Sequence, residues 1–108
     1  MPIELNRDNY ETEVNGSDIP VLVDFWGPLC GPCLALMPSV EAMENEYQGK
    51  LKVTKLNATE NRMLCAKLRV MSLPTFLFYR DGTEVKRMNG EDITKDQIKK
   101  TIDEVIKA

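Results

Sequence analysis

Two cysteines separated by two residues, Cys30 and Cys33, are the side chains of this sequence best suited to chemistry. The preceding residues, 21–26, form an apolar run typical of a strand that is buried on both faces. The following residues, 34–47, carry apolar side chains at helical spacing. Cys30 is therefore predicted at the start of a helix, where free backbone N–H groups and the helix dipole favour the reactive thiolate. Cys33, one turn later, is close enough to form a disulfide with Cys30.

The Cys30-Gly31-Pro32-Cys33 motif has three interpretations. As a dithiol redox pair, it uses Gly31 and Pro32 for a tight turn, and proline is well tolerated in the first turn of a helix. As half of a zinc site, it needs two more ligands, but the sequence has one further cysteine, Cys65, and no histidine. As a purely structural feature, the two cysteines would only pack together. The number of cysteines favours the redox pair, because three cysteines are too few for a disulfide framework.

Composition places the motif in an acidic, moderately hydrophobic chain. Its 108 residues predict a single domain over 1–108, and a hydrophobic content of 43% is enough to bury a core without disulfide bonds. The net charge is −3 with no basic stripe, which argues against nucleic acid as a partner. No run suggests a signal peptide or a membrane span. We therefore expect a cytoplasmic setting and no membrane contact. Cys65, the third cysteine, is expected to be a small buried side chain or, alternatively, a regulatory or dimer-forming thiol.

The hydrophobic pattern predicts alternating strands and helices, followed by a hairpin and a last helix. The Asp81-Gly82 pair suits the hairpin turn, and Thr94 with Gln97 forms a capping box. This order predicts an α/β fold with a central mixed sheet of about five strands flanked by about four helices. The strands are expected at 3–5, 21–26, 52–57, 75–79 and 84–88, and the helices at about 6–14, 30–47, 61–68 and from 94 onward.

Asp24 interrupts the apolar strand six residues before Cys30. A buried carboxylate must find a partner or hold a proton. Lys55 occupies a matching place in the next predicted strand, with apolar neighbours on both sides. The two side chains either face solvent on one side of the sheet or form a semi-buried pair below Cys33. In the second case Asp24 is a candidate base for deprotonating Cys33, and this is the arrangement that we expect.

The sequence resembles the thioredoxin family along nearly its whole length. A CxxC motif alone is a moderate signal, whereas an ordered set of matching stretches with the right spacing is highly specific. The matching stretches are Val23-Asp24-Phe25-Trp26, Cys30-Gly31-Pro32-Cys33, Pro38, Lys55-Leu56-Asn57, Leu73-Pro74-Thr75, Asp81-Gly82 and Gly90.

The resemblance implies the thioredoxin fold and a protein-disulfide reductase that carries electrons in its two sulfurs, with no bound cofactor. Cys30 would attack a substrate disulfide, and Cys33, deprotonated with help from Asp24, would release the product. Lys55 would be the partner of Asp24. Pro74 would be a cis proline that brings the Leu73 backbone beside Cys30, where a substrate segment can pair as an added strand.

The same resemblance implies partners and a binding surface. The partners would be disulfide-containing proteins and a thioredoxin reductase, which could draw on NADPH through a flavoenzyme or on ferredoxin, and the protein would be a monomer. Substrate would contact Leu29, Gly31, Pro32, Leu73 and Gly90. Leu29 and Leu34 depart from the family pattern, which usually has tryptophan before the first cysteine and a basic residue after the second. The alternative function is a binding or docking module that keeps the fold without redox turnover.

Overall fold

Five strands form one mixed sheet at the centre of the molecule, as described by a computed structural model over residues 1–107. The strand order is β1-β3-β2-β4-β5. β1 and β2 pair with β3 in parallel, whereas β4 is antiparallel to both β2 and β5. The strand before the cysteines, β2, is therefore the middle strand and is held on both edges. The strands are β1 (Ile3–Leu5), β2 (Val21–Trp26), β3 (Lys52–Asn57), β4 (Thr75–Arg80) and β5 (Thr83–Asn89).

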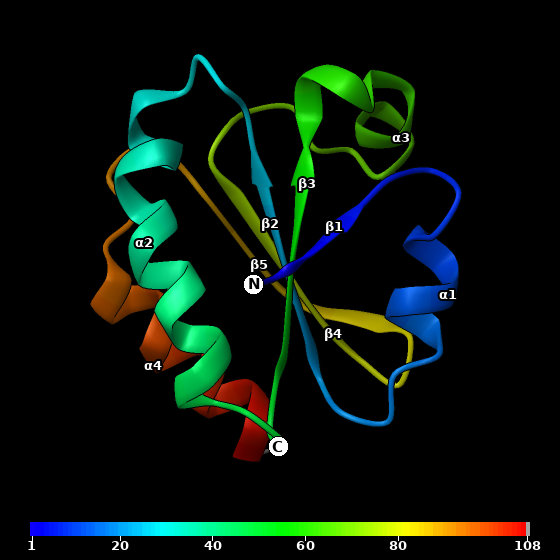
Figure 1. The fold of residues 1–108 in the computed structure, drawn as a ribbon, viewed down its shortest axis with the longest axis vertical. Coiled ribbons are helices and arrows are strands. Elements are labelled where there is room, and N and C mark those ends of the chain that lie inside the picture. The colour runs from blue at the N-terminus through cyan, green and yellow to red at the C-terminus, as the bar shows by residue number, and fades with distance from the viewer. Residues whose placement is uncertain (108) are drawn as a thin grey trace.

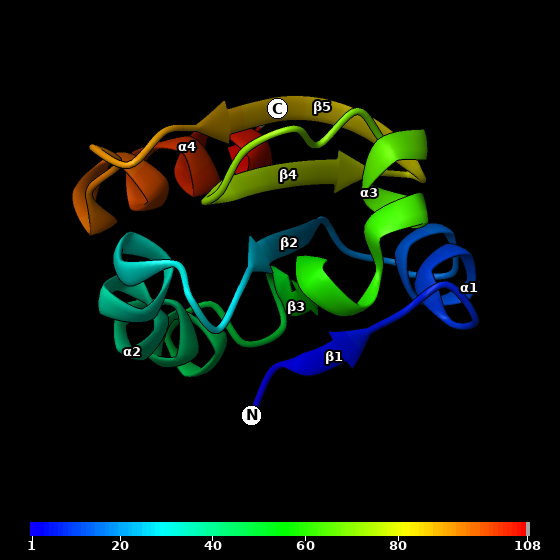
Figure 2. The same ribbon diagram turned by 90° about the horizontal axis from the view of Figure 1, so that it is seen from above.

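Helices cover both faces of this sheet. Helices α2 and α4 lie on one face, and α1 and α3 lie on the other (Figure 1). The view from above shows α1 and α3 together on one side of the sheet, with α2 and α4 on the other (Figure 2). No helix within the described residues is long and apolar enough to cross a membrane. The helices are α1 (Tyr10–Asn15), α2 (Gly31–Glu46), α3 (Arg62–Lys67) and α4 (Lys95–Lys107), with a short 3₁₀-helix η1 (Ala58–Glu60) before α3.

Alternation along β2 divides the core into two clusters. Val21, Val23 and Phe25 are buried with side chains of α1 and α3, whereas Leu22 is buried with side chains of α2 and α4. Side chains two residues apart in a strand point to the same face. Asp24 therefore faces α2 and α4, the side of the sheet on which the cysteine-bearing helix packs.

The predicted α/β order, with five strands and four helices, is confirmed, and most boundaries lie within two residues of the prediction. The capping box is present: the Thr94 N–H donates to Gln97 Oε1 at 2.9 Å, and the Gln97 N–H donates to Thr94 Oγ1 at 3.2 Å. The start of the first helix was predicted too early. The Asn6 side chain accepts from the backbone of Asp8 and Asn9, which makes a turn there and delays the helix.

Arg87 on β5 connects the sheet to the end of α3 through hydrogen bonds. Its guanidinium donates to the carbonyl oxygens of Leu68 and Arg69, at 2.9 and 2.8 Å, and also binds Glu84. Carbonyl groups at a helix end lack partners within the helix, so these bonds stabilise the end of α3. The segment that carries Leu73 and Pro74 follows directly after this stabilised helix end.

Candidate active site

Cys30 is the N-cap residue of α2. Its backbone is extended, with φ −91° and ψ 101°, and its Sγ accepts a hydrogen bond from the Cys33 N–H at 3.2 Å. Gly31 and Pro32 form the first turn of the helix, where proline costs no hydrogen bond. The predicted position of Cys30 at a helix start is confirmed. A sulfur at this place receives a backbone donor and the positive end of the helix dipole, which stabilises negative charge.

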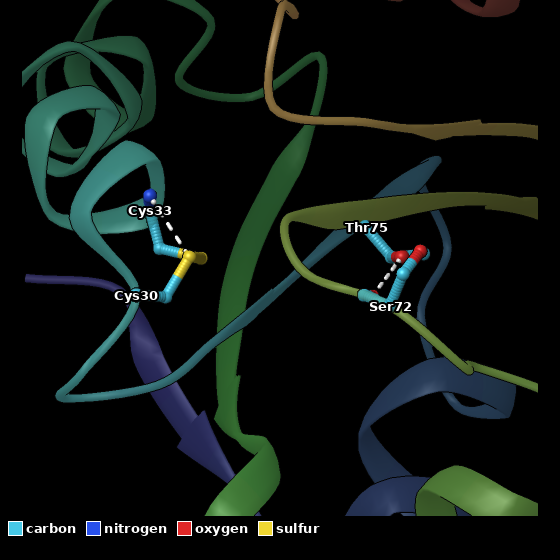
Figure 3. The surroundings of a disulfide bond; sticks show 4 residues. All are labelled: Cys30, Cys33, Ser72 and Thr75. Carbon is cyan, nitrogen blue, oxygen red and sulfur yellow. Dashed lines mark hydrogen bonds between the residues drawn. A yellow bond between two sulfur atoms is a disulfide. The ribbon is translucent and has the colours of Figure 1, made fainter.

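A disulfide joins Cys30 to Cys33, with the two Cα atoms 5.3 Å apart (Figure 3). The two residues differ in their access to solvent. Cys33 is 1% exposed, whereas Cys30 is partly exposed and follows Leu29, which is 96% exposed. A large partner can therefore approach the disulfide through Cys30 but not through Cys33. This asymmetry fits the roles that the sequence assigns to the two cysteines.

The segment that contains Pro74 lies in the surroundings of the disulfide. The Leu73–Pro74 peptide bond is cis, as the resemblance implied, and Thr75 Oγ1 donates to the Ser72 carbonyl at 2.6 Å (Figure 3). The Gly90 N–H donates to the Pro74 carbonyl at 3.2 Å, and Gly90 has φ +120°, a conformation that side chains disfavour. Gly90 is thus bonded to the cis-proline segment, although the two are far apart in sequence.

Gly27 is a site residue that the sequence analysis did not identify. A Cβ atom at this position would lie 3.1 Å from Leu73 Cδ1, closer than such contacts normally allow. Glycine therefore permits Leu73 to pack against the loop that leads to Cys30. The available signal was a glycine placed directly after a buried strand, which often marks close approach of another segment.

Asp24 is a buried carboxyl group without a hydrogen-bond partner. It is 1% exposed, and neither carboxyl oxygen has a partner among the described residues. Burial disfavours the charged form and raises the pKa of Asp24 to about 7, against a smaller lowering by the positive charge of Lys55 and with a further rise from the negative charge of Glu4. Asp24 can therefore gain or lose a proton near neutral pH.

Lys55 lies beside Asp24 but pairs with other carboxylates. The two residues are opposite each other in the β2–β3 register. The Lys55 ammonium lies 3.8 Å from Glu41 Oε2 and 4.0 Å from Glu4 Oε1. The two side chains expected as a semi-buried pair thus lie side by side, but Asp24 has no hydrogen-bond partner within residues 1–107, so no direct bond joins it to Lys55. Glu4 and Glu41 are partly exposed, so these ion pairs cost less hydration than a pair with a fully buried carboxylate would.

Cys65 is a free cysteine in α3 and is 6% exposed. It packs in the cluster under α1 and α3, and burial raises the pKa of its thiol. The expectation of a small buried side chain is confirmed. Within residues 1–107, no three side chains of His, Cys, Asp or Glu gather in a way that could hold a metal ion.

Comparison with known proteins agrees with this geometry. Residues 1–104 match the model of the family described as thioredoxin. The chain belongs to the thioredoxin family. A thioredoxin of Acetoanaerobium sticklandii is 44% identical over 91 residues, which cover 84% of this chain and 87% of that protein. A thioredoxin of Chlorobaculum thiosulfatiphilum is 41% identical over 103 residues, which cover 95% of this chain and 94% of that protein.

Family membership and the bridged cysteine pair together define the activity. The protein is a thiol-disulfide oxidoreductase whose redox centre is the Cys30–Cys33 pair. Its partners are disulfide-containing substrates and a thioredoxin reductase. A docking module with an idle cysteine pair is not favoured, because the two cysteines are placed where they form a disulfide.

Replacing Asp24 by asparagine should stabilise the oxidised protein, and more so at high pH. The folded-state pKa of Asp24 is raised above its unfolded value, so the wild type should lose stability as the pH rises from about 4 to about 7. The amide has no charge to bury. We expect Asp24→Asn to be more stable by roughly 2–4 kcal/mol at pH 8 and by much less at pH 4. Urea unfolding at both pH values measures the difference in free energy of unfolding between Asp24→Asn and the wild type. A difference that does not grow with pH would contradict the raised pKa.

Proposed function

We propose that the protein reduces disulfides of cytoplasmic proteins with Cys30 as the nucleophile, Cys33 as the resolving thiol and Asp24 as the base that serves Cys33. The observation that carries the proposal is the contrast between a partly exposed Cys30 at the helix N-cap and a buried Cys33 one turn later. A cytoplasmic setting is part of the proposal: Cys65 is an unpaired cysteine, and thiols persist in that reducing compartment.

The reaction divides into two thiol–disulfide exchanges. The Cys30 thiolate attacks one sulfur of a substrate disulfide, the substrate S–S bond breaks, and the first substrate thiolate leaves. Cys33 then gives its proton to Asp24 and attacks Cys30 Sγ, so that the mixed disulfide breaks and the second substrate thiolate leaves. Two electrons have passed to the substrate, and the Cys30–Cys33 disulfide remains. A thioredoxin reductase returns two electrons to restart the cycle.

Asp24 suits the base role because of its burial and its place in the sheet. It faces the side on which α2 packs, and its pKa of about 7 means that protons can enter and leave it near neutral pH. Catalytic groups commonly have a pKa close to the working pH. An exposed aspartate, with its lower pKa, would be a weaker base for a thiol.

Substrate is proposed to bind across Leu73, Gly90 and the start of α2. The Leu73 main chain precedes the cis proline, in the surroundings of the disulfide, where an extended substrate segment can add as a strand. Gly31 and Pro32 present little side-chain bulk beside Cys30. Recognition through the main chain explains how one protein can reduce many substrates, because it reads the backbone rather than a particular side chain.

The thioredoxin reductase is proposed to recognise a modified surface around Cys30. Leu29 is 96% exposed and Leu34 is 46% exposed, and both positions differ from the family pattern. Leucine offers apolar contact area but lacks the flat ring and the N–H group of tryptophan. A reductase that binds the usual tryptophan would gain less from this protein, which favours a different reductase, either a flavoenzyme adapted to leucine or a ferredoxin-linked enzyme.

The first test of the proposed function is mixed-disulfide trapping. Cys33→Ser should form a stable covalent adduct with a disulfide-containing protein such as insulin, because the attack by Cys30 proceeds and its resolution does not. Cys30→Ser should form none, since Cys33 is buried. Non-reducing electrophoresis followed by mass spectrometry of the linked peptides measures both. Adducts through Cys33 in the Cys30→Ser protein would reverse the assignment, and Cys65→Ser controls for the spare thiol.

The second test concerns Asp24. Asp24→Asn should slow the resolving step by at least about tenfold at neutral pH, within the range of general base catalysis. It should also remove the change of the resolving rate with pH near pH 7. The rate of the first attack by Cys30 should stay unchanged. Stopped-flow measurement of the two exchanges from pH 5 to 9 separates them. An unchanged resolving rate over this whole range would exclude Asp24 as the base.

The third test concerns the surface around Cys30. Leu29→Trp should raise kcat/KM with an NADPH-dependent thioredoxin reductase by about threefold or more, because aromatic anchors contribute strongly at interfaces. Met63→Trp is the matched control: it places the same ring at an exposed position in α3, outside the cysteine motif, and should change nothing. If the natural protein is already reduced as well as Leu29→Trp, residue 29 does not determine the choice of reductase.

A further inference from the structure

Three charged residues lie in a row across the sheet. Glu4 of β1 is opposite Lys55 of β3, and Lys55 is opposite Asp24 of β2. Residues opposite each other in neighbouring strands project to the same face. Leu22 and Val53, two positions before Asp24 and Lys55, are both buried under α2 and α4. The whole row therefore lies on the face that the cysteine-bearing helix covers.

Glu4 is held in place by two contacts. Its Oε1 lies 4.0 Å from the Lys55 ammonium, and its Oε2 accepts from Trp26 Nε1 at 3.3 Å. The ammonium also lies 3.8 Å from Glu41 Oε2 on α2 and 5.9 Å from the centre of the Trp26 ring. All of these contacts draw the positive charge of Lys55 toward groups other than Asp24, whose carboxyl oxygens have no partner among the described residues.

We propose that Glu4 is a positioning residue for the reaction: by holding the Lys55 ammonium away from Asp24, it sets the pH at which Asp24 can accept the proton of Cys33. The inference rests on the proposed role of Asp24 as the base. It assigns a function to a residue of the edge strand β1, which is separated from Asp24 on β2 by the whole of strand β3. Glu41 shares the hold on Lys55 from the helix side.

The charged groups around Asp24 determine in which direction Glu4 shifts the pKa of Asp24. Lys55 from β3 is the cation nearest in register, Glu4 comes from β1, and α2 contributes Glu41 and Cys33. Phe76 of β4, opposite Asp24, is apolar, and so are Ile98 and Ile102, the α4 side chains buried on the same face of the sheet. A cation favours the carboxylate and an anion opposes it. Neutralising Glu4 releases Lys55 toward Asp24 and removes a negative charge, and both changes lower the pKa of Asp24.

The experiment compares Glu4→Gln in two backgrounds. Glutamine keeps an oxygen that can accept from Trp26 Nε1, so the contact with the ring is preserved while the charge is removed. The Asp24 carboxyl is titrated by ¹³C NMR, and the resolving rate is measured over the same pH range. Both sets of measurements are made for the wild type, Glu4→Gln, Lys55→Met and the double variant. Glu11→Gln, which removes an equal charge from α1 on the opposite face, is the matched control.

Glu4→Gln should shift both the Asp24 titration and the limb of the rate profile to lower pH by about half a unit, the size expected for one partly screened charge. In the Lys55→Met background the same change should produce less than half of that shift, because Glu4 acts through Lys55. Glu11→Gln should shift neither. A shift of equal size with and without Lys55 would overturn the proposal, because Glu4 would then act as a charge alone, and the absence of any shift would overturn it as well.

Failure of the underlying function gives a different result. If Asp24→Asn leaves the resolving rate unchanged at every pH, Asp24 is not the base, and the kinetic role of Glu4 falls with it. The NMR titration of Asp24 would still respond to Glu4→Gln through Lys55 in that case. A titration that does not respond, together with a rate that depends on Asp24, would instead overturn the role of Glu4 and leave the proposed function standing.

Discussion

The rest of the structure depends on how strand β2 passes into helix α2. β2 is hydrogen-bonded on both edges, to β3 and to β4, and its residues up to Phe25 are paired in both ladders, so the end of the strand is held firmly. Only the short loop from Gly27 to Leu29 separates it from Cys30, the N-cap of the helix. The reactive sulfur is therefore positioned by the packing of the whole core rather than by a flexible loop, which is the arrangement that precise active sites require.

Local signals were enough to predict most of the fold. Strand β3 begins and ends at the predicted residues, and the Thr94–Gln97 capping box forms as its sequence pattern indicates. The errors also have local causes. Asn6 suits an N-cap, but it forms a side-chain turn with Asp8 and Asn9 instead, and this competition between caps and turns is not decided by residue type. The short helix η1 has too little periodicity to be recognised.

Features of the site that depend on distant segments were harder to predict. The helix-start position of Cys30 and the burial of Asp24 follow from neighbouring residues and were predicted correctly. The partners of Lys55 come from β1 and α2, so register and helix packing decide them, and the sequence suggested Asp24 instead. The contact between Gly27 and Leu73 likewise joins segments that are far apart in the chain. The chemistry of a single motif can be predicted from the sequence. The electrostatic environment of a side chain depends on several elements, so it can be determined only once the fold is known.

The difference in exposure between Cys30 and Cys33 restricts how electrons can flow. Because only Cys30 reaches the surface, the electron donor and the electron acceptor must use the same sulfur. They compete for one place and cannot occupy it together, so the protein works as a shuttle that visits them in turn. A substrate that stayed bound after its reduction would block recharging. Brief contacts of modest strength therefore serve turnover better than tight ones, and the main-chain binding that we propose at Leu73 would meet this kinetic demand.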